Sequence, residues 1–131
     1  MTNADVIRAH YAASDAGDID GMVAPLSPHV TWTEAAGFPY AGTYSGPDEV
    51  VRNVFARIAE DWDAYRFTVD EVIDGGDTVV GIGAYSGTYR LTGRFFEARV
   101  AHVWRLKDGV VTAFEQFTDT AMVQKALRGS A

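Results

Sequence analysis

Residues 94–118, RFFEARVAHVWRLKDGVVTAFEQFT, carry the strongest structural signal in the sequence. It predicts two long antiparallel strands joined by a tight turn at 107–109, because Asp-Gly between two β-rich runs is a strong hairpin signal. Side chains alternate between the two faces of a strand. In the first strand, the even face from Phe96 onward is apolar except for His102, whereas the odd face carries four charged residues. A titratable group at the centre of an apolar strand face indicates a pocket.

The composition is that of one globular domain spanning residues 1–131. Of the 131 residues, 47% are hydrophobic and 22% charged, which is enough for one core but not for a second. The formal net charge is −7, and no cluster of Lys or Arg occurs, so neither nucleic acid nor an anionic membrane is an expected partner. No signal peptide or membrane span is recognisable, which makes a cytoplasmic location the default.

Local signals predict three helices before the long strands and one short helix after them. The first is capped by Thr2 or Asn3 and ends at Gly17, and the second is a short helix capped by Asp18. A third starts at 46–49, where proline and acidic residues occupy the first turn. The helix after the strands can be capped by Asp119.

The remaining strands are expected at 30–34, 65–73 and 78–90, and the segment AAGFPYAGTYSG, residues 35–46, is expected to be a loop. Gly81, Gly83 and Gly87 predict a bend or bulge in the strand at 78–90. Together these elements predict an α+β fold, a cone-shaped barrel of strongly curved antiparallel sheet on three N-terminal helices. Ligand pockets commonly form at the mouth of such a cone.

Three short segments resemble the nuclear transport factor 2-like superfamily. They are Ala16-Gly17-Asp18-Ile19 after the first helix, Tyr44-Ser45-Gly46-Pro47 before the third, and His102-Val103-Trp104-Arg105-Leu106 leading into Asp108-Gly109. Within the superfamily the chain is most similar to the SnoaL-like and ketosteroid isomerase-related branch, over nearly its whole length. The resemblance is more specific for the fold than for the reaction, because this fold hosts isomerases, cyclases, epoxide hydrolases, dehydratases and binding proteins.

The resemblance implies a set of site residues. The catalytic aspartate of the steroid isomerases corresponds to Glu34, and their helix-1 tyrosine corresponds to His10, or to Tyr11 if the alignment slips by one residue. Their protonated aspartate corresponds to His102, where the polyketide cyclases of this branch also carry a histidine. The catalytic acid of those cyclases falls near Gln116, and a glutamine cannot act as a base.

We therefore expect Glu34 to be a general base, with His102 and one of His10 and Tyr11 stabilising developing negative charge. Burial would raise the pKa of Glu34 and suit it to proton transfer near neutrality. The alternatives are a solvated carboxylate for Glu34 and a core histidine for His102. The expected substrate-binding residues, with Tyr85 as a further wall candidate, are Trp32, Phe38, Tyr40, Tyr44, Phe96, Val100, Trp104, Phe114, Gln116 and Thr118.

The predicted function is cofactor-independent isomerisation, through an enolate, of a small and largely apolar molecule such as a steroid-like or polyketide-like ligand. His10, His29 and His102 lack metal-ligand spacing, so no metal is expected. A cyclase, an epoxide hydrolase and a non-catalytic small-ligand-binding protein are the alternatives. A dimeric interaction module with a filled cone is a further one. The resemblance implies a homodimer through the outer face of the sheet.

Overall fold

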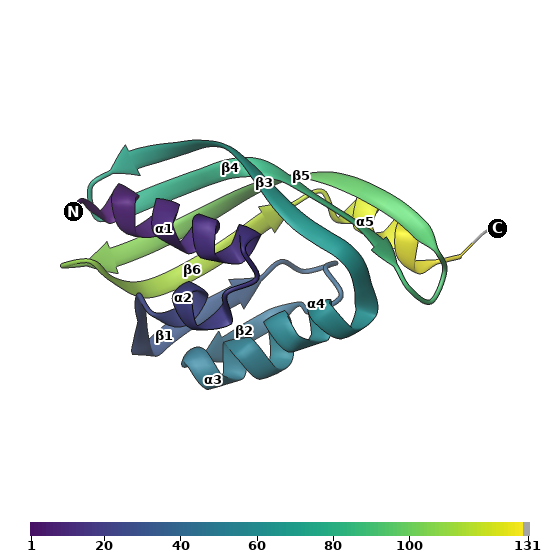
Figure 1. The fold of residues 1–131 in the computed structure, drawn as a ribbon, viewed down its shortest axis with the longest axis horizontal. Helices are drawn as coiled ribbons and strands as arrows, with labels where there is room; N and C mark the ends of the chain where they lie inside the picture. Colours follow the sequence, from purple (N-terminus) through teal and green to yellow (C-terminus); the bar gives the residue numbers. More distant parts are fainter. Residues whose placement is uncertain (130–131) are drawn as a thin grey trace.

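The computed structural model describes residues 1–129 as one curved six-stranded sheet with helices packed on it (Figure 1). Along the chain the elements are α1 (Asn3–Asp15), α2 (Ile19–Val23), β1 (Leu26–Glu34), β2 (Gly42–Ser45), α3 (Pro47–Val50), the π-helical turn η1 (Val51–Phe55), α4 (Ala56–Asp61), β3 (Trp62–Gly75), β4 (Thr78–Tyr89), β5 (Arg94–Lys107), β6 (Val110–Thr118) and α5 (Thr120–Leu127). The strand order is β2-β1-β6-β5-β4-β3, so β2 and β3 form the edges and the sheet stays open. The predicted α+β fold class is confirmed.

The β5–β6 hairpin forms as its sequence predicts. Every even position of β5 from Phe96 to Leu106 is buried, and no odd position is. The turn residues Asp108 and Gly109 have φ angles of 51° and 78°, as a tight turn between right-twisted strands requires. His102 lies opposite Gly81 of β4 and Gln116 of β6, at the centre of the inner face.

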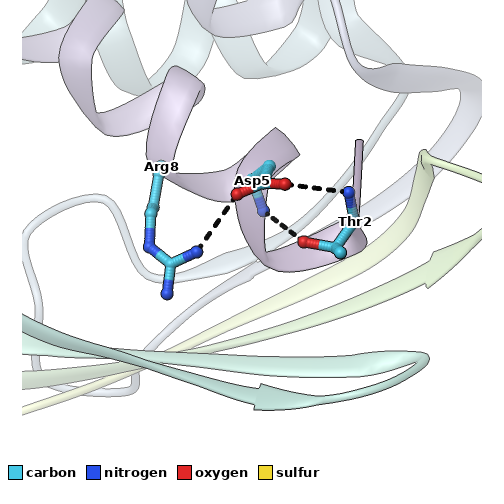
Figure 2. Close-up of polar contacts among 3 residues, drawn as sticks. All are labelled: Thr2, Asp5 and Arg8. Atoms are coloured by element: carbon cyan, nitrogen blue, oxygen red, sulfur yellow. Dashed lines mark hydrogen bonds and ion pairs between the residues drawn. The ribbon is translucent and has the colours of Figure 1, made fainter.

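A capping box begins α1, as Figure 2 shows. The Asp5 backbone N–H donates to the Thr2 hydroxyl at 3.1 Å, and the Thr2 backbone N–H donates to the Asp5 carboxylate at 3.0 Å. Arg8 adds an ion pair to the same carboxylate at 3.3 Å. The cap fixes where the helix starts, and with that start the buried face of α1 includes His10 and Tyr11.

The two ends of the sheet carry different helices (Figure 1). One core cluster lies around Trp32 and Trp104 and includes residues of α1, α3 and η1. The other lies around Trp62 and Phe96 and includes Val123 of α5, at the opposite end of the molecule from the N-terminus. Among residues 1–129, no helix is both long and apolar enough to cross a membrane.

Two details differ from the sequence-based expectation in the N-terminal half of the sheet. First, β1 starts at Leu26 rather than at residue 30, and it runs parallel to β6, so one strand pair of the expected antiparallel sheet is parallel. Buried Leu26 and Val30 anchor this extended start. Second, residues 42–45 of the expected loop form β2, which pairs antiparallel with β1. The Gly and Pro content of the loop concealed this short strand.

The expected bulge in β4 is wrong, because the irregularities lie in its neighbour. The register between β3 and β4 shifts between Asp63 and Arg66 and again between Val69 and Glu71 of β3. The glycines of β4 serve close approach instead: a Cβ atom at Gly81 would lie 2.0 Å from the Tyr11 hydroxyl. The glycines of β4 thus leave room for aromatic side chains from other elements to pack on its inner face.

Candidate functional site

A cavity of about 790 Å³ lies between the helices and the inner face of the sheet. This volume falls in the range of small-molecule pockets, roughly 300–1,000 Å³. Strands β1, β3, β4, β5 and β6 each contribute at least one residue to the wall formed by the sheet. The helical segments α1, α2, η1 and α4 supply the opposite wall. The aromatic wall residues outside the tyrosines are Trp32, Phe55, Trp62, Phe67, Trp104 and Phe114.

Glu34 is the last residue of β1 and lines this cavity with a side chain that is only 4% exposed. Burial raises the pKa of Glu34 to about 8, and the nearby Trp32 indole N–H offsets part of that rise. That indole Nε1 nevertheless has no hydrogen-bond partner within residues 1–129, so its contact with the carboxyl group falls short of a full hydrogen bond. The same holds for the hydroxyl of Tyr65, another wall residue. Buried polar groups without partners are rare in folded proteins and call for an explanation.

His102 is held between two tyrosines. Its Nδ1 lies 2.9 Å from the Tyr11 hydroxyl, and its Nε2 lies 2.7 Å from the Tyr85 hydroxyl. Trp104 Nε1 donates to the Tyr11 hydroxyl at 2.9 Å, and Gln116 Nε2 donates to the Tyr85 hydroxyl at 2.9 Å. Both ring nitrogens are therefore engaged, so His102 has no free N–H with which to contact a ligand directly.

Both buried histidines are neutral at physiological pH. Burial, followed by repulsion from His10, lowers the pKa of His102 to about 3. Burial also lowers the pKa of His10 to about 4, although the Met22 carbonyl partly opposes this. The His10 Nδ1 lies 2.9 Å from the Met22 carbonyl oxygen, and since a carbonyl only accepts, Nδ1 carries the proton.

The structure brings together all four residues expected to be catalytic, along with three of the expected substrate-binding residues. Glu34, His102, His10 and Tyr11 line the cavity, and so do the aromatic residues Trp32, Trp104 and Phe114. At most one of His10 and Tyr11 was expected to reach it, yet both do. The His10 ring packs edge-on against Trp104 at 4.7 Å, and the Tyr11 ring stacks on His102 at 5.8 Å. Both residues therefore contact Trp104, but only Tyr11 reaches His102 through a hydrogen bond.

The other expected substrate-binding residues lie outside the cavity wall, and these are Phe38, Tyr40, Tyr44, Phe96, Val100, Gln116 and Thr118. Four of them are taken up by the second core cluster, namely Phe38, Tyr40, Phe96 and Val100. Tyr44 donates to the Tyr40 carbonyl at 2.7 Å, and Thr118 donates to the Arg99 carbonyl at 3.0 Å. Gln116 sits behind Tyr85. Strand parity predicted which side chains face the interior. It did not predict which of these belong to the packed core and which line the cavity.

Several wall residues were not predicted as ligand contacts. Tyr65 and Phe67 of β3 share one strand face, and this alternation was the signal that could have placed them on the wall. Val54 and Phe55 lie in the π-helical turn η1, a feature often found at functional sites. Nothing in the local sequence distinguishes that turn from an ordinary helix. Within residues 1–129 no group of three His, Asp or Glu side chains is placed to hold a metal ion.

Comparison with known proteins agrees with this architecture. The structure of an NTF2-like protein from Burkholderia thailandensis E264 is 55% identical, with 98% of each chain covered and a TM-score of 0.96. An NTF2-like protein from Burkholderia pseudomallei K96243 is 30% identical, with coverage of 98% of this chain and 100% of that one and a TM-score of 0.89. TerC, co-crystallised with polyporic acid, is 26% identical, with 97% and 98% coverage and a TM-score of 0.86.

A search of curated proteins gave no match. A family model described as a SnoaL-like domain matches residues 7–114, which is most of the chain. The TM-scores of the two NTF2-like structures show that they share the fold of this chain. The chain therefore belongs to the SnoaL-like domain family, within the NTF2-like superfamily.

Proposed function

We propose that this protein is a cofactor-independent enzyme that carries out acid–base chemistry on a small, largely apolar molecule bound in the cavity. The observation that carries the proposal is Glu34, a buried carboxyl group on the cavity wall whose pKa is raised to about 8. A carboxyl group with such a pKa can accept a proton and return it near neutral pH. The aromatic wall supplies a surface that favours an apolar substrate.

The reaction that we place first is isomerisation of an unsaturated ketone through an enolate. The Glu34 carboxylate removes a proton from the carbon next to the carbonyl, and the electrons of that C–H bond move onto the carbonyl oxygen. A tyrosine hydroxyl on the wall donates a hydrogen bond to the enolate oxygen. Glu34 then returns the proton to a different carbon, so the double bond shifts and no atom is gained or lost. Donors of this kind typically contribute roughly 10²–10³-fold to the rate.

A second candidate is binding without turnover. TerC, which is 26% identical to this chain, was co-crystallised with polyporic acid, and that supports a small-molecule ligand here too. Polyporic acid is therefore the first ligand to test by titration. A ring-closing or epoxide-opening reaction would require the same carboxyl group, so the Glu34 variant described next bears on those alternatives as well.

The test measures proton abstraction directly. A cyclic β,γ-unsaturated ketone is incubated with the protein in D₂O, and conjugation is followed by ultraviolet absorbance and deuterium uptake by mass spectrometry. We expect Glu34→Gln to reduce both rates by at least about 100-fold while retaining affinity for polyporic acid. Glu97→Gln is the matched control, because Glu97 is exposed on the outer face of β5. Wild-type rates in Glu34→Gln contradict the proposal. Binding of polyporic acid with no exchange in the wild type favours the binding protein.

The homodimer implied by the resemblance stays a prediction. Two phenylalanines of the outer sheet face, Phe95 and Phe117, are 66% and 48% exposed. Exposed aromatic residues of this size are common at subunit interfaces. Sedimentation velocity should find a dimer for the wild type and a monomer for Phe117→Asp, and a monomeric wild type contradicts the prediction.

A further inference from the structure

The tyrosine–histidine–tyrosine row at the cavity wall has a fixed number of protons. The Tyr11 hydroxyl, the Tyr85 hydroxyl and the neutral His102 ring each carry one proton, which makes three. The row contains two hydrogen bonds, one on each side of the ring, and each uses one proton. One proton is therefore left over, and it must belong to one of the two tyrosines.

The tautomer of His102 decides which tyrosine keeps that proton. If Nδ1 carries the ring proton, it donates to Tyr11, and Tyr85 must donate to Nε2, which leaves the Tyr11 proton free. If Nε2 carries it, the ring donates to Tyr85, and Tyr11 must donate to Nδ1, which leaves the Tyr85 proton free. The neighbours cannot change this count, because each supplies only a donor. The Trp104 indole has no acceptor, and the Gln116 amide is fixed because its Oε1 accepts from the Ala35 N–H at 2.9 Å.

The position of Tyr85 favours it as the tyrosine with the free proton. Ala35, which orients Gln116 and through it Tyr85, directly follows Glu34 in the chain. After burial, the charge of Glu34 is the next cause that raises the pKa of Tyr85, whereas Glu34 does not contribute to the raised pKa of Tyr11. Glu34 and Tyr85 both line the cavity, so one bound substrate can contact both of them. Tyr11 lies on the far side of the His102 ring.

We propose that Tyr85 donates the hydrogen bond to the substrate oxygen and that His102 is a positioning residue that frees this proton by carrying its own on Nε2. In this state the Tyr85 oxygen accepts from both His102 and Gln116, and two accepted hydrogen bonds polarise its O–H bond and make it a stronger donor. The opposite tautomer would present a lone pair to the substrate oxygen. The role assigned to Tyr85 rests on the proposed function, but its test requires no turnover.

The first experiment is ¹⁵N NMR of histidine-labelled wild-type protein saturated with acetophenone. This probe has an apolar ring and a single carbonyl oxygen that can only accept a hydrogen bond. We expect the His102 signals of a neutral ring with the proton on Nε2. A proton on Nδ1, a doubly protonated ring, or a probe that does not bind would each overturn the proposal.

The second experiment follows the infrared carbonyl stretch and the affinity of ¹³C-labelled acetophenone. Tyr85→Phe should remove the shift of this band to lower frequency and weaken binding about fivefold to tenfold. Tyr89→Phe is the matched control, since it makes the same change farther along β4 and outside the cavity wall, and it should leave the band unchanged. Equal bands in the two variants would overturn the role of Tyr85. Both proposals are supported if Glu34→Gln loses turnover while His102 carries its proton on Nε2 and Tyr85→Phe removes the carbonyl shift. If the wild type shows these spectra but has no turnover, only the proposed enzymatic function is overturned.

Discussion

The polar groups around His102 and those around Glu34 differ in whether they have hydrogen-bond partners. Around His102, both ring nitrogens, two tyrosine hydroxyls, the Trp104 indole and the Gln116 amide are all hydrogen-bonded. Around Glu34, the Trp32 indole and the Tyr65 hydroxyl have no partner within residues 1–129, and burial dominates the carboxyl group. A satisfied buried network makes a structure rigid, whereas an unsatisfied one costs stability. The difference indicates that the His102 region maintains the shape of the site and leaves one tyrosine proton for a ligand, whereas the polar groups around Glu34 are open to the ligand.

Removal of the Glu34 charge should have the largest effect on stability. The folded pKa of about 8 lies above the ordinary carboxyl pKa of 4.5, so the folded protein holds one more proton than the unfolded chain between those pH values. Its free energy of unfolding therefore falls as pH rises through this window, by roughly 5 kcal/mol from Glu34 alone. Glu34→Gln should match the wild type at pH 4.5 and exceed its stability by several kcal/mol at pH 9, as measured by urea unfolding. Glu97→Gln should show no such crossover, and a Glu34 variant that tracks the wild type at every pH contradicts the prediction.

Replacement of His102 tests the fully hydrogen-bonded region of the wall. His102→Phe removes a hydrogen-bond partner from Tyr11 and from Tyr85, and each loss costs about 1–3 kcal/mol when the group stays buried. We expect the variant to be about 3 kcal/mol less stable than the wild type at pH 7.5. The folded pKa of about 3 lies below 6.5, so the wild type itself loses stability as pH falls below 6.5, and the gap should narrow toward pH 4. A gap that widens in acid would show that the ring is charged.

The pH dependence of turnover tests the Glu34 region in the working protein. Glu34 must be ionised to accept a proton, so kcat/KM should rise about tenfold per pH unit and level off near pH 8. Between about pH 6 and pH 8 the rise amounts to roughly 50-fold, because half of the Glu34 carboxyl groups are ionised at pH 8. Initial rates with the unsaturated ketone across this range measure it. A flat profile would show that Glu34 is already ionised at pH 6 or takes no part.

The smallest effect comes from a matched pair of tryptophans. Trp32 and Trp104 are both buried, but within residues 1–129 only the Trp104 indole has a hydrogen-bond partner. Replacement of either by Phe removes similar apolar area, so the difference between them isolates the N–H group. Trp104→Phe should be about 1 kcal/mol more destabilising than Trp32→Phe, as measured by thermal or urea unfolding. Equal losses would contradict the division of the wall into two kinds of region.

The features of the site that depend on strand parity and on turn residues could be predicted from the sequence. His102 and Trp104 share the even face of β5, and the Asp108-Gly109 turn fixes the hairpin, so both were predictable. Glu34 followed from a family resemblance. The partners of His102 did not follow from it. Tyr11 is 91 residues away, and its contact depends on how α1 lies against the sheet. Tyr85 is 17 residues away, and its contact depends on the register and curvature of β4 beside β5. Such long-range side-chain geometry is set by packing, which periodicity does not encode.

The parallel pairing of β1 with β6 has a consequence for how the protein is made. β1 lies between β2 and β6, and β6 is the last of the six strands to emerge from the ribosome. Pairings between segments so far apart in sequence form slowly, because a long loop must close first. A nascent chain that lacks β6 therefore leaves one side of β1 unpaired and Phe114 missing from the wall beside Trp32. The environment that raises the pKa of Glu34 then arises late in synthesis, and titration of this single carboxyl group would report when the fold is complete.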